Sequence, residues 1–485
     1  MLKVIITFKL NNGKSWTVGK TVTGKISGLT DKFGIVIRDY EFKFFVNYFE
    51  GSGTEKDPYL ITNADDLYNV RYVSNGNYFK QTQDIDLSAY DENRLDKDYI
   101  YRGWEPITLE SCNYDGNGHK ITNLYIKGGW ECALFAGINH SYIKNLGIEI
   151  SIKGLGSEGP DIVGALVGQA CDGSTIENCW VKGSGKIYSG DYCGGIVGNL
   201  CENSVMINCY SDVETIGTMC GGGTVGGLAG MVGENCTVKN CYSLGKVSGE
   251  GYVGGLFGRV TKTTINNCFS KSKVTAIFQG TACCGGLFGE LFESNVKNCY
   301  FVGELKTDNS EGTDNTTFTM GGLVGYSSGS SIVNCYSICD IDSYSGHIGG
   351  ILGEDYSGYT IYGGNQITNC YSGCSNIKTQ SGELARIIVP VSYSGKYATT
   401  ITNCYANKNM KLIKNGVTSQ PGLQNPLPST VALDGINGAN LLDNPDWKNE
   451  IFKDGYDEGT SFDDIWQIGS SGFPKLKNMP GNPVQ

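Results

Sequence analysis

A repeat is the feature of this chain that most restricts its fold. The dipeptide Asn-Cys, followed by a large residue, occurs eight times between residues 178 and 404, at intervals of 27 to 36 residues. A knot of the form Gly-(Gly/Ala)-Φ-Φ-Gly, in which Φ is apolar, stands before seven of the pairs, as at 164–168 and 254–258. Self-similarity at such a period is typical of stacked units that each contact their neighbours. The sequence therefore predicts a solenoid. The pairs are Asn178-Cys179, Asn208-Cys209, Asn240-Cys241, Asn267-Cys268, Asn298-Cys299, Asn334-Cys335, Asn369-Cys370 and Asn403-Cys404.

The segments around each pair predict short strands joined by a bend. Residues 175–181 and 237–243 alternate between polar and apolar side chains and are rich in β-branched and aromatic residues, which is typical of strands with one buried face. The alternation slips by one position at the Asn, so we expect the bend there. If coils stack about 4.8 Å apart, the Asn amides would form a ladder along the stack. The small Cys would fill a narrow core beside it, so all eight pairs are predicted members of a structural ladder.

The cysteines also raise the alternative of metal or redox chemistry. Thiolate sites need sulfurs in Cys-x2-Cys pairs or beside histidines, whereas the 19 cysteines here are spread along the repeat and the chain has three histidines. We therefore predict no metal and no cofactor. An odd number of cysteines in a thiol-rich core favours a reducing compartment.

An aromatic residue follows each Asn-Cys pair. These residues are Trp180, Tyr210, Tyr242, Phe269, Tyr300, Tyr336, Tyr371 and Tyr405. If they face outward, they form a stripe suited to stacking on sugar rings, and all except Phe269 and Tyr405 are our candidate binding residues. The alternative is that they pack inside the solenoid or against a neighbouring coil. The variable loops 307–319, 354–365 and 378–399 are a second place for recognition.

Charge and composition divide the chain into four parts. Residues 1–50 hold eight Lys/Arg and four Asp/Glu, whereas the whole chain has a net charge of −11. We predict a β docking module at 1–50, the first solenoid coils at 51–128, repeats at 129–407 and a C-terminal cap at 408–485. The acidic solenoid argues against nucleic-acid binding. The lack of a run of 18 apolar residues argues against membrane insertion.

The repeated Gly-Gly-Leu-Φ-Gly and Ile-x-Asn-Cys-Tyr-Ser segments resemble the GLUG motif. The segment from Gly51 to Ile61 is similar to the usual start of such regions, and Trp466 with the segment from Phe473 to Leu476 is similar to their usual end. The resemblance covers about residues 51–480. It implies an all-β protein, a parallel β-helix or β-solenoid of about 8 to 10 coils, found in bacterial surface proteins, in stalks of immunoglobulin-cleaving metallopeptidases and in phage-encoded proteins.

The function expected from the sequence is binding rather than catalysis. The chain lacks the His-Glu-x-x-His motif of metallopeptidases, and the acidic positions Asp84, Asp86, Asp115 with His119, and Glu354 are ordinary in turns and loops. Residues 1–12 do not resemble a signal peptide, which predicts synthesis in the cytoplasm. We therefore expect a non-enzymatic component of a phage tail fibre or baseplate, attached to its particle through residues 1–50, that binds a bacterial surface glycan or protein receptor. A secreted adhesin and a β-helix glycan lyase or hydrolase are the alternatives, and the oligomeric state is open.

Overall fold

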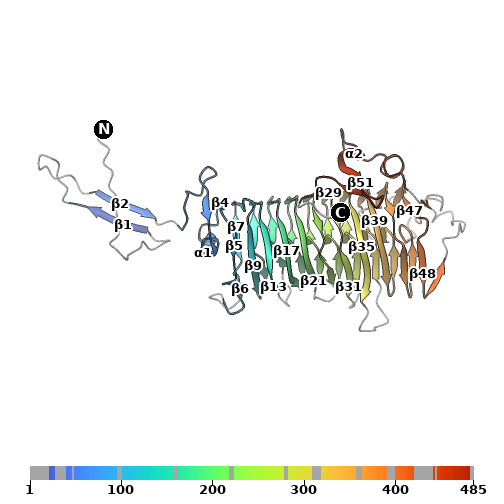
Figure 1. Ribbon diagram of the computed structural model, residues 1–485, viewed down its shortest axis with the longest axis horizontal. Helices are drawn as coiled ribbons and strands as arrows, with labels where there is room; N and C mark the ends of the chain where they lie inside the picture. The colour runs from blue at the N-terminus through green and yellow to red at the C-terminus, as the bar shows by residue number, and fades with distance from the viewer. Residues whose placement is uncertain are drawn as a thin grey trace.

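The chain forms an all-β parallel solenoid of about 9 turns, in which 56% of residues are in strands and 5% in helices, and this confirms the predicted fold class. The structure is a computed structural model (Figure 1). It describes residues 21–27, 40–45, 48–95, 101–156, 162–217, 223–277, 282–308, 318–356, 363–389, 399–419, 441–442 and 445–480. No helix among these residues is long and apolar enough to cross a membrane.

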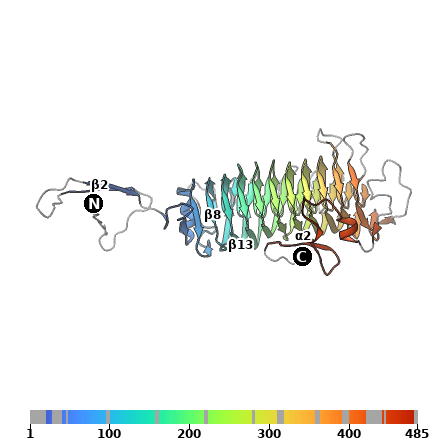
Figure 2. The same ribbon diagram turned by 90° about the horizontal axis from the view of Figure 1, so that it is seen from above.

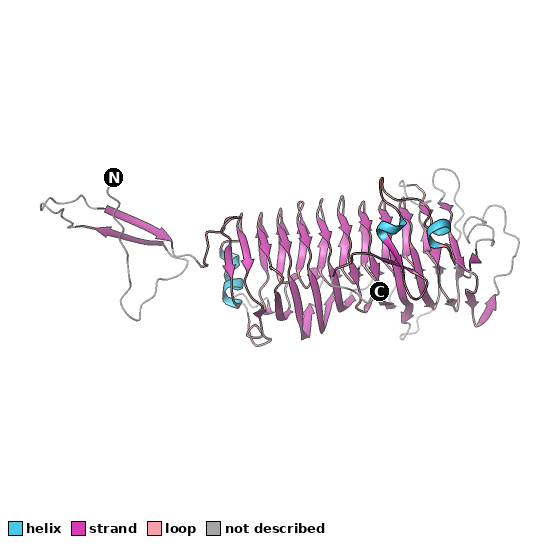
Figure 3. Ribbon diagram, turned by 45° about the horizontal axis from the view of Figure 1, so that its top comes forward, coloured by secondary structure: helices cyan, strands magenta, loops and turns pink. Residues whose placement is uncertain are grey.

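The coils contribute strands to four sheets that run along the solenoid, and nearly all of the strand pairs are parallel. Figure 3 shows strands of successive coils side by side. We call them sheets I to IV in the order in which a coil visits them. Sheet I contains β10 (Glu131–Cys132), β14 (Ile162–Gly164), β18 (Tyr192–Gly194), β22 (Thr224–Gly226), β27 (Tyr252–Gly254), β32 (Ala282–Gly285), β36 (Phe318–Gly321), β40 (His347–Gly349) and β45 (Glu383–Ala385). Sheet II contains β7 (Ile107–Glu110), β11 (Phe135–Asn139), β15 (Val167–Cys171), β19 (Val197–Leu200), β23 (Ala229–Val232), β28 (Phe257–Thr261), β33 (Phe288–Phe292), β37 (Val324–Ser328) and β41 (Leu352–Asp355).

Sheets III and IV carry the strands on either side of the Asn-Cys bend. Sheet III contains β3 (Tyr59–Ile61), β4 (Tyr78–Gln81), β8 (Asn113–Asp115), β12 (Tyr142–Lys144), β16 (Thr175–Glu177), β20 (Val205–Ile207), β24 (Thr237–Lys239), β29 (Thr264–Asn266), β34 (Asn295–Lys297), β38 (Ser331–Val333), β42 (Gln366–Thr368) and β46 (Thr400–Thr402). Sheet IV contains β5 (Ile85–Asp86), β6 (Arg102–Gly103), β9 (Lys120–Lys127), β13 (Gly147–Gly156), β17 (Trp180–Ser189), β21 (Tyr210–Gly217), β25 (Tyr242–Ser243), β26 (Val247–Gly249), β30 (Phe269–Ser270), β31 (Lys273–Ile277), β35 (Tyr300–Asp308), β39 (Tyr336–Ser343), β43 (Tyr371–Ser372), β44 (Asn376–Thr379), β47 (Tyr405–Asn407), β48 (Lys411–Lys414), β49 (Val417–Ser419) and β50 (Leu441–Leu442).

The bend between sheets III and IV lies at the Asn of each pair. Every one of these residues has a left-handed backbone conformation, for example φ 55° at Asn334 and φ 54° at Asn369. Asn tolerates this conformation better than other non-Gly residues because its short amide can bond locally. Asn145, which precedes Leu146 and not a Cys, has the same conformation, with φ 53°. The left-handed bend therefore requires the Asn, whereas the Cys that follows it is not required for the bend.

The Asn side chains are stacked along the solenoid. The Nδ2 group of each Asn in the eight pairs donates to the Oδ1 atom of the Asn one coil earlier, at 2.7 to 3.4 Å. The first of these acceptors is Asn145, whose own Nδ2 donates to Asp115 Oδ1 at 3.0 Å. Each rung satisfies one donor and one acceptor, and at the buried Asn298, Asn334 and Asn369 it replaces the water that cannot reach them.

The Cys residues form a second column, directed into the core. The Cys179 backbone N–H group donates to the Cys209 Sγ atom at 3.4 Å, and the next four pairs along the column repeat this bond at 3.4 to 3.5 Å. All eight thiols are buried and reduced in the structure. Each sulfur also donates to a carbonyl two residues earlier, as Cys299 does to Lys297 at 3.2 Å. The thiols therefore act as small core groups that also bind the backbone.

The glycine knots lie at the corner between sheets I and II, where successive coils come closest. A Cβ atom on Gly255 would be 2.1 Å from the Gly286 carbonyl oxygen on the next coil, and one on Gly286 would be 2.2 Å from the Gly322 oxygen. Neither residue has a positive φ. Close approach of backbone to backbone, and not a special dihedral angle, therefore requires the glycines here.

The described parts of the N-terminal region include an antiparallel pair, β1 (Thr21–Ile26) and β2 (Tyr40–Phe45). The other residues of the predicted docking module before residue 48 lie outside the described part of the chain. Phe49 packs on the first coil, 5.1 Å from the Tyr59 ring. A short helix, α1 (Ala64–Asn69), and the turn Val70–Tyr72 bury Leu67 in the same core. Residues 48–50 thus belong with the solenoid.

The C-terminal segment differs from the predicted cap. Its described residues 445–480 do not close the last coil but run back along the flank of the solenoid, where Figures 1 and 2 show them in red. They include the π-turn Trp447–Ile451, α2 (Phe462–Ile465) and the antiparallel pair β51 (Trp466–Ile468) and β52 (Pro474–Leu476). We call residues 445–480 the strap. The expectation of an end cap is therefore corrected for these residues, because their apolar side chains pack on a side face.

Candidate binding surface between sheets I and II

The aromatic residues after the Asn-Cys pairs form a column on sheet IV. The rings of Tyr210 and Tyr242 are 4.9 Å apart and nearly parallel, at 1°, and Phe269 and Tyr300 stack at 4.8 Å and 1°. Each ring face is therefore used by the ring of the next coil. Tyr210, Tyr242, Tyr300, Tyr336 and Tyr371 are all buried, so they offer no exposed faces to a sugar. The interpretation of these rings as an exposed binding stripe is corrected, since stacking consumes their faces.

The strap covers the edges of this column. Tyr242 Oη donates to the Pro480 carbonyl oxygen at 2.9 Å, and Tyr336 Oη donates to the Pro474 oxygen at 2.5 Å. Trp466 lies over Tyr300 and Tyr336, with ring centroids 6.2 Å away from both. Trp180, at the N-terminal end of the column, is only partly buried, and the Lys182 Nζ atom is 5.3 Å from its ring. The column therefore serves as the docking surface of the strap.

On a different surface of the solenoid, polar and aromatic side chains lie close together. Outward side chains of sheets I and II meet at the corner that the glycine knots form. We call this the corner surface and define it by Tyr252, Arg259, Cys283, Glu290, Tyr326, His347 and Glu354. Along sheet II, Arg259, Glu290, Tyr326 and Glu354 occupy the same register position on four successive coils.

Contacts across the corner show that the two sheets face one another there. Along sheet II, the Arg259 Nε atom is 2.5 Å from Glu290 Oε2, and across the corner the Arg259 guanidinium carbon is 5.6 Å from the Tyr252 ring on sheet I. The His347 Nδ1 atom on sheet I is 3.3 Å from Glu354 Oε2 on sheet II. These contacts explain why outward side chains are so well covered: Glu290 has 3% of its side chain exposed, whereas Arg259 keeps 39%.

The surroundings at the corner shift the pKa values of the ionisable side chains there. Burial raises the pKa of Glu290 to about 7, with Arg259 opposing the shift. Burial also raises the pKa of Tyr252 and that of Cys283, each to about 12. The hydrogen bond to Glu354 raises the pKa of His347. Perturbed pKa values gathered in one place are typical of functional sites.

The same corner contains polar atoms that the protein does not satisfy. Among the described residues, Asn199 Oδ1 and Thr224 Oγ1 are buried without a hydrogen-bond partner. Asn199 lies on sheet II in register with Met231 and Arg259, and Thr224 lies on sheet I next to Tyr252. Buried polar atoms normally have partners, so these two atoms mark places where water or a ligand would bind.

The corner surface was not predicted, although its residues follow a simple pattern in the sequence. Its sheet I residues stand two positions before the first Gly of a knot, as Tyr252 does before Gly254, and its sheet II residues directly follow the last Gly, as Arg259 follows Gly258. Aligning the knots would have placed these residues together. The sequence predicts Glu354 in a loop, but in the structure it lies on β41.

The other acidic candidates make local structural contacts. Asp84 Oδ1 is 3.3 Å from His119 Nδ1 and accepts the Lys120 N–H group at 3.1 Å. Asp86 accepts a hydrogen bond from Asn123. Asp115 begins the Asn ladder. Within the described ranges, no three His, Cys, Asp or Glu side chains are grouped so that they could hold a metal ion.

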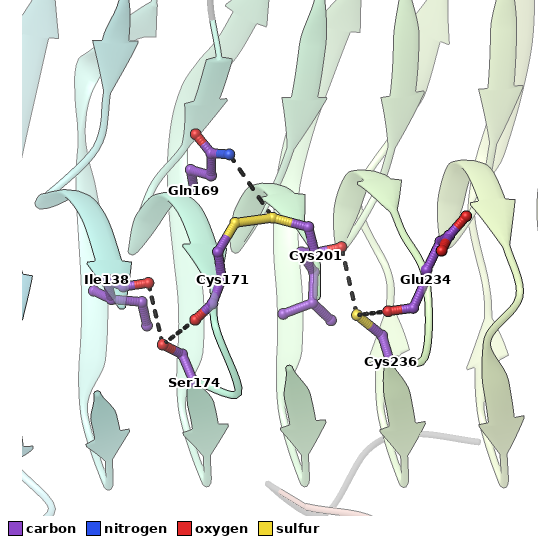
Figure 4. The surroundings of a disulfide bond; sticks show 8 residues. Ile138, Gln169, Cys171, Ser174, Cys201, Glu234 and Cys236 are labelled. Atoms are coloured by element: carbon purple, nitrogen blue, oxygen red, sulfur yellow. Dashed lines mark hydrogen bonds between the residues drawn. A yellow bond between two sulfur atoms is a disulfide. The ribbon is translucent and has the colours of Figure 1, made fainter. Parts of the chain in front are cut away.

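A disulfide joins Cys171 and Cys201 on neighbouring coils, with Cα atoms 4.8 Å apart (Figure 4). Gln169 Nε2 donates to the Cys201 sulfur at 3.7 Å. The other described cysteines are free and buried. The bridge does not agree with the reducing compartment that the odd number of cysteines favoured, since disulfides persist in oxidising compartments.

One prediction follows from the corner acids. Between about pH 4.5 and pH 7 the folded chain keeps a proton on Glu290 that the unfolded chain releases, so stability falls as the pH rises. The pKa of His347 is also raised in the folded protein, so its contribution to stability is likewise lost as the pH rises. Urea denaturation should find the protein less stable at about pH 8 than at about pH 5, with about 3 kcal/mol of the loss due to Glu290. Glu290→Gln should remove that part, and an unchanged pH dependence in this variant would contradict the assignment.

Segments of the chain are similar to parts of two curated proteins. A protein of Evansella cellulosilytica, provisionally named as a Gly-rich membrane protein, is 37% identical over 129 residues, which are 24% of this chain and 14% of that protein. Halomucin of Haloquadratum walsbyi is 34% identical over 88 residues, 18% of this chain and 1% of that protein. The chain therefore spans a small fraction of the length of these relatives. No protein-family model matches it, and the likeness to GLUG-motif proteins remains a resemblance.

Two solved structures align with the chain. One is a Bacteroides ovatus protein provisionally named an immunoglobulin A1 protease, with 18% identity and a TM-score of 0.37 over 88% of this chain and 94% of that chain. The other is named IgA1 protease, with 13% identity and a TM-score of 0.36 over 80% of this chain and 24% of that chain. At these values neither likeness carries an argument about the site or the reaction.

Two expectations from the sequence change with these comparisons. The solved neighbours bear the name of an enzyme, so the expectation of a protein without enzymatic activity is withdrawn, and no reaction is assigned to this chain. One curated relative is provisionally named a Gly-rich membrane protein and the other is named halomucin, in line with the cell-surface alternative. A role in a phage tail, with attachment through residues 1–50, stays a prediction from the sequence.

Proposed function

We propose that this chain is a cell-surface solenoid that binds a neutral, hydroxyl-rich glycan along the corner surface. The observation that carries the proposal is the convergence of aromatic rings, ion pairs and unsatisfied polar atoms on one corner of successive coils. The names of the two curated relatives and the Cys171–Cys201 bridge support the location outside the cell.

The chemistry of the corner favours a neutral sugar over a charged polymer. Its charges are paired within the protein, Arg259 with Glu290 and His347 with Glu354, so little net charge is available for a polyanion. The Tyr326 and Tyr356 rings, with centroids 4.6 Å apart, provide apolar surface beside hydroxyl groups, a combination that suits sugars. Neighbouring coils are about 4.8 Å apart, which is comparable to the length of one pyranose unit in a linear chain.

Binding to immobilised neutral polysaccharides tests the proposal. The full chain should bind at least one of them, and Arg259→Ala and Tyr326→Ala should each weaken binding at least about tenfold, as expected for central contact residues. Lys273→Ala is the matched control, because Lys273 forms an ion pair with Glu304 at 2.9 Å on sheet IV, away from the corner. Circular dichroism would verify that all variants fold.

Three outcomes of this test would be informative. Equal losses in Lys273→Ala and the corner variants would show that the effect is not local, and binding that both corner variants leave unchanged would refute the corner as the site. Release of new reducing ends during the same incubation would show that the protein cleaves the glycan, as the lyase or hydrolase alternative requires.

A further inference from the structure

Two cysteines outside the Asn-Cys column lie unusually close together. Cys339 is in β39, and Cys374 lies between β43 and β44, the two strands that pair with β39 on the next coil. The Cys339 and Cys374 Sγ atoms are 3.0 Å apart. Both side chains are buried, with 5% and 0% of the residue exposed. The pair is 35 residues apart in sequence and therefore spans one coil.

The contacts of this pair differ from those of the Cys column. A column sulfur has its short contacts with backbone atoms, as Cys335 has with the Val333 oxygen at 3.2 Å. For Cys374, the contacts with Ser337 Oγ and the Gly350 oxygen are both 3.9 Å long, so Cys339 is much the nearest partner. The sulfur atoms of this pair therefore face each other and not the backbone.

We propose that Cys339 and Cys374 form a second disulfide between neighbouring coils when the protein folds in an oxidising compartment. The Cys171–Cys201 bridge shows that adjacent coils place Cα atoms 4.8 Å apart, inside the range of disulfides, about 4.4 to 6.8 Å. Bond formation requires the sulfurs of Cys339 and Cys374 to move about 1 Å closer than their present 3.0 Å. Side-chain rotation can supply this without a shift of the backbone ladder.

In this pair, Cys374 can act as the nucleophile and Cys339 as the second thiol. The hydrogen bond with Cys339 lowers the pKa of Cys374, whereas burial raises the pKa of Cys339. With a small-molecule disulfide as oxidant, the Cys374 thiolate attacks one oxidant sulfur and releases the first thiolate. Cys339 then loses its proton, attacks the Cys374 sulfur and releases the second. Two protein thiols are oxidised to one disulfide, and the oxidant is reduced to two thiols.

The bridge would hold the coil that carries one end of the corner surface. The loop between Cys339 and Cys374 contains β40 and β41, and these strands place His347 and Glu354. A covalent link between the ends of such a loop stabilises the folded state by restricting the unfolded chain. The inference does not depend on the proposed ligand.

Peptide mapping tests the second bridge. The full chain would be folded with a mixture of oxidised and reduced glutathione, alkylated, and digested without reduction. We expect a cross-linked peptide that contains Cys339 and Cys374, together with the Cys171–Cys201 peptide. In Cys339→Ser, Cys374 should be alkylated once the protein is denatured, while the Cys171–Cys201 bridge remains. Reduction should lower the thermal midpoint more in the wild type than in this variant.

Several results would overturn the second bridge. One is alkylation of both Cys339 and Cys374 after denaturation of wild-type protein in which Cys171 and Cys201 are bridged. Another is pairing of either residue with a different cysteine, and a third is a chain with no bridge at all. If Cys339→Ser fails to fold, the map of the wild-type protein decides alone.

Discussion

Replacing Gly286 with valine is expected to destabilise the solenoid by more than about 4 kcal/mol or to prevent folding. A Cβ atom there would lie 2.2 Å from the Gly322 carbonyl oxygen and 2.3 Å from the Phe301 ring. Ordinary overpacking costs about 1 to 3 kcal/mol, and more where the clash is with backbone that cannot move. The next coil cannot move away, because parallel ladders and the Asn rungs hold it at a fixed spacing. Urea denaturation followed by circular dichroism would measure the loss.

Gly137→Val is the matched control for this substitution. Gly137 lies on sheet II and outside the knots, and the nearest atoms to its added Cβ would be 3.8 and 3.9 Å away. We expect a change of about 1 kcal/mol or less, in the range of substitutions without a clash. Equal stability losses at both positions would show that the knots are not close contacts between coils.

The second large effect is expected at Asn334. This residue is fully buried, has φ 55°, donates to Asn298 at 3.4 Å and accepts from Asn369 at 3.0 Å. Asn334→Ala should cost about 4 kcal/mol. About 1 to 2 kcal/mol come from the left-handed backbone, and about 1 to 3 kcal/mol come from each partner left unsatisfied. Thermal and chemical denaturation would measure the total.

Two further variants separate these causes. Asn334→Gly keeps the backbone conformation and loses only the rungs, so it should recover about 1 to 2 kcal/mol relative to Asn334→Ala. Asn178→Ala removes a solvent-exposed rung at φ 52° and should cost less, because water can replace the lost bonds. Stability of Asn334→Ala within about 1 kcal/mol of the wild type would rule out the ladder as a major contribution.

The architecture could be predicted because it depends on the spacing of residues within one coil and between neighbouring coils. The period of the Asn-Cys pairs and the slip in alternation at each Asn depend on single coils and their neighbours, so they are visible without knowledge of distant contacts. Asn145 shows the limit of the motif. It is the start of the Asn column but precedes Leu146, and only its backbone angle and its bond to Asp115 identify it.

The parts that could not be predicted depend on contacts between distant segments. Tyr242 and Pro480 are 238 residues apart, and no local pattern near either residue shows that a C-terminal segment covers the aromatic column. The corner surface could not be predicted for a different reason. Tyr252 and Arg259 share one coil, whereas Glu290 and Tyr326 come from the next two coils. Each residue is ordinary alone, so only the register of the sheets brings them together.

Radical footprinting of a glycan complex tests the central claim most directly. It would compare the oxidation of tyrosine, arginine and histidine side chains in the free protein and with the polysaccharide selected by the binding screen. We expect protection of Tyr252, Arg259, Tyr326 and His347, which line the corner surface, and no change at Trp180 or at the strap. Protection confined to Trp180 and the strap, with the corner residues oxidised as in the free protein, would contradict the assignment of the corner as the binding surface.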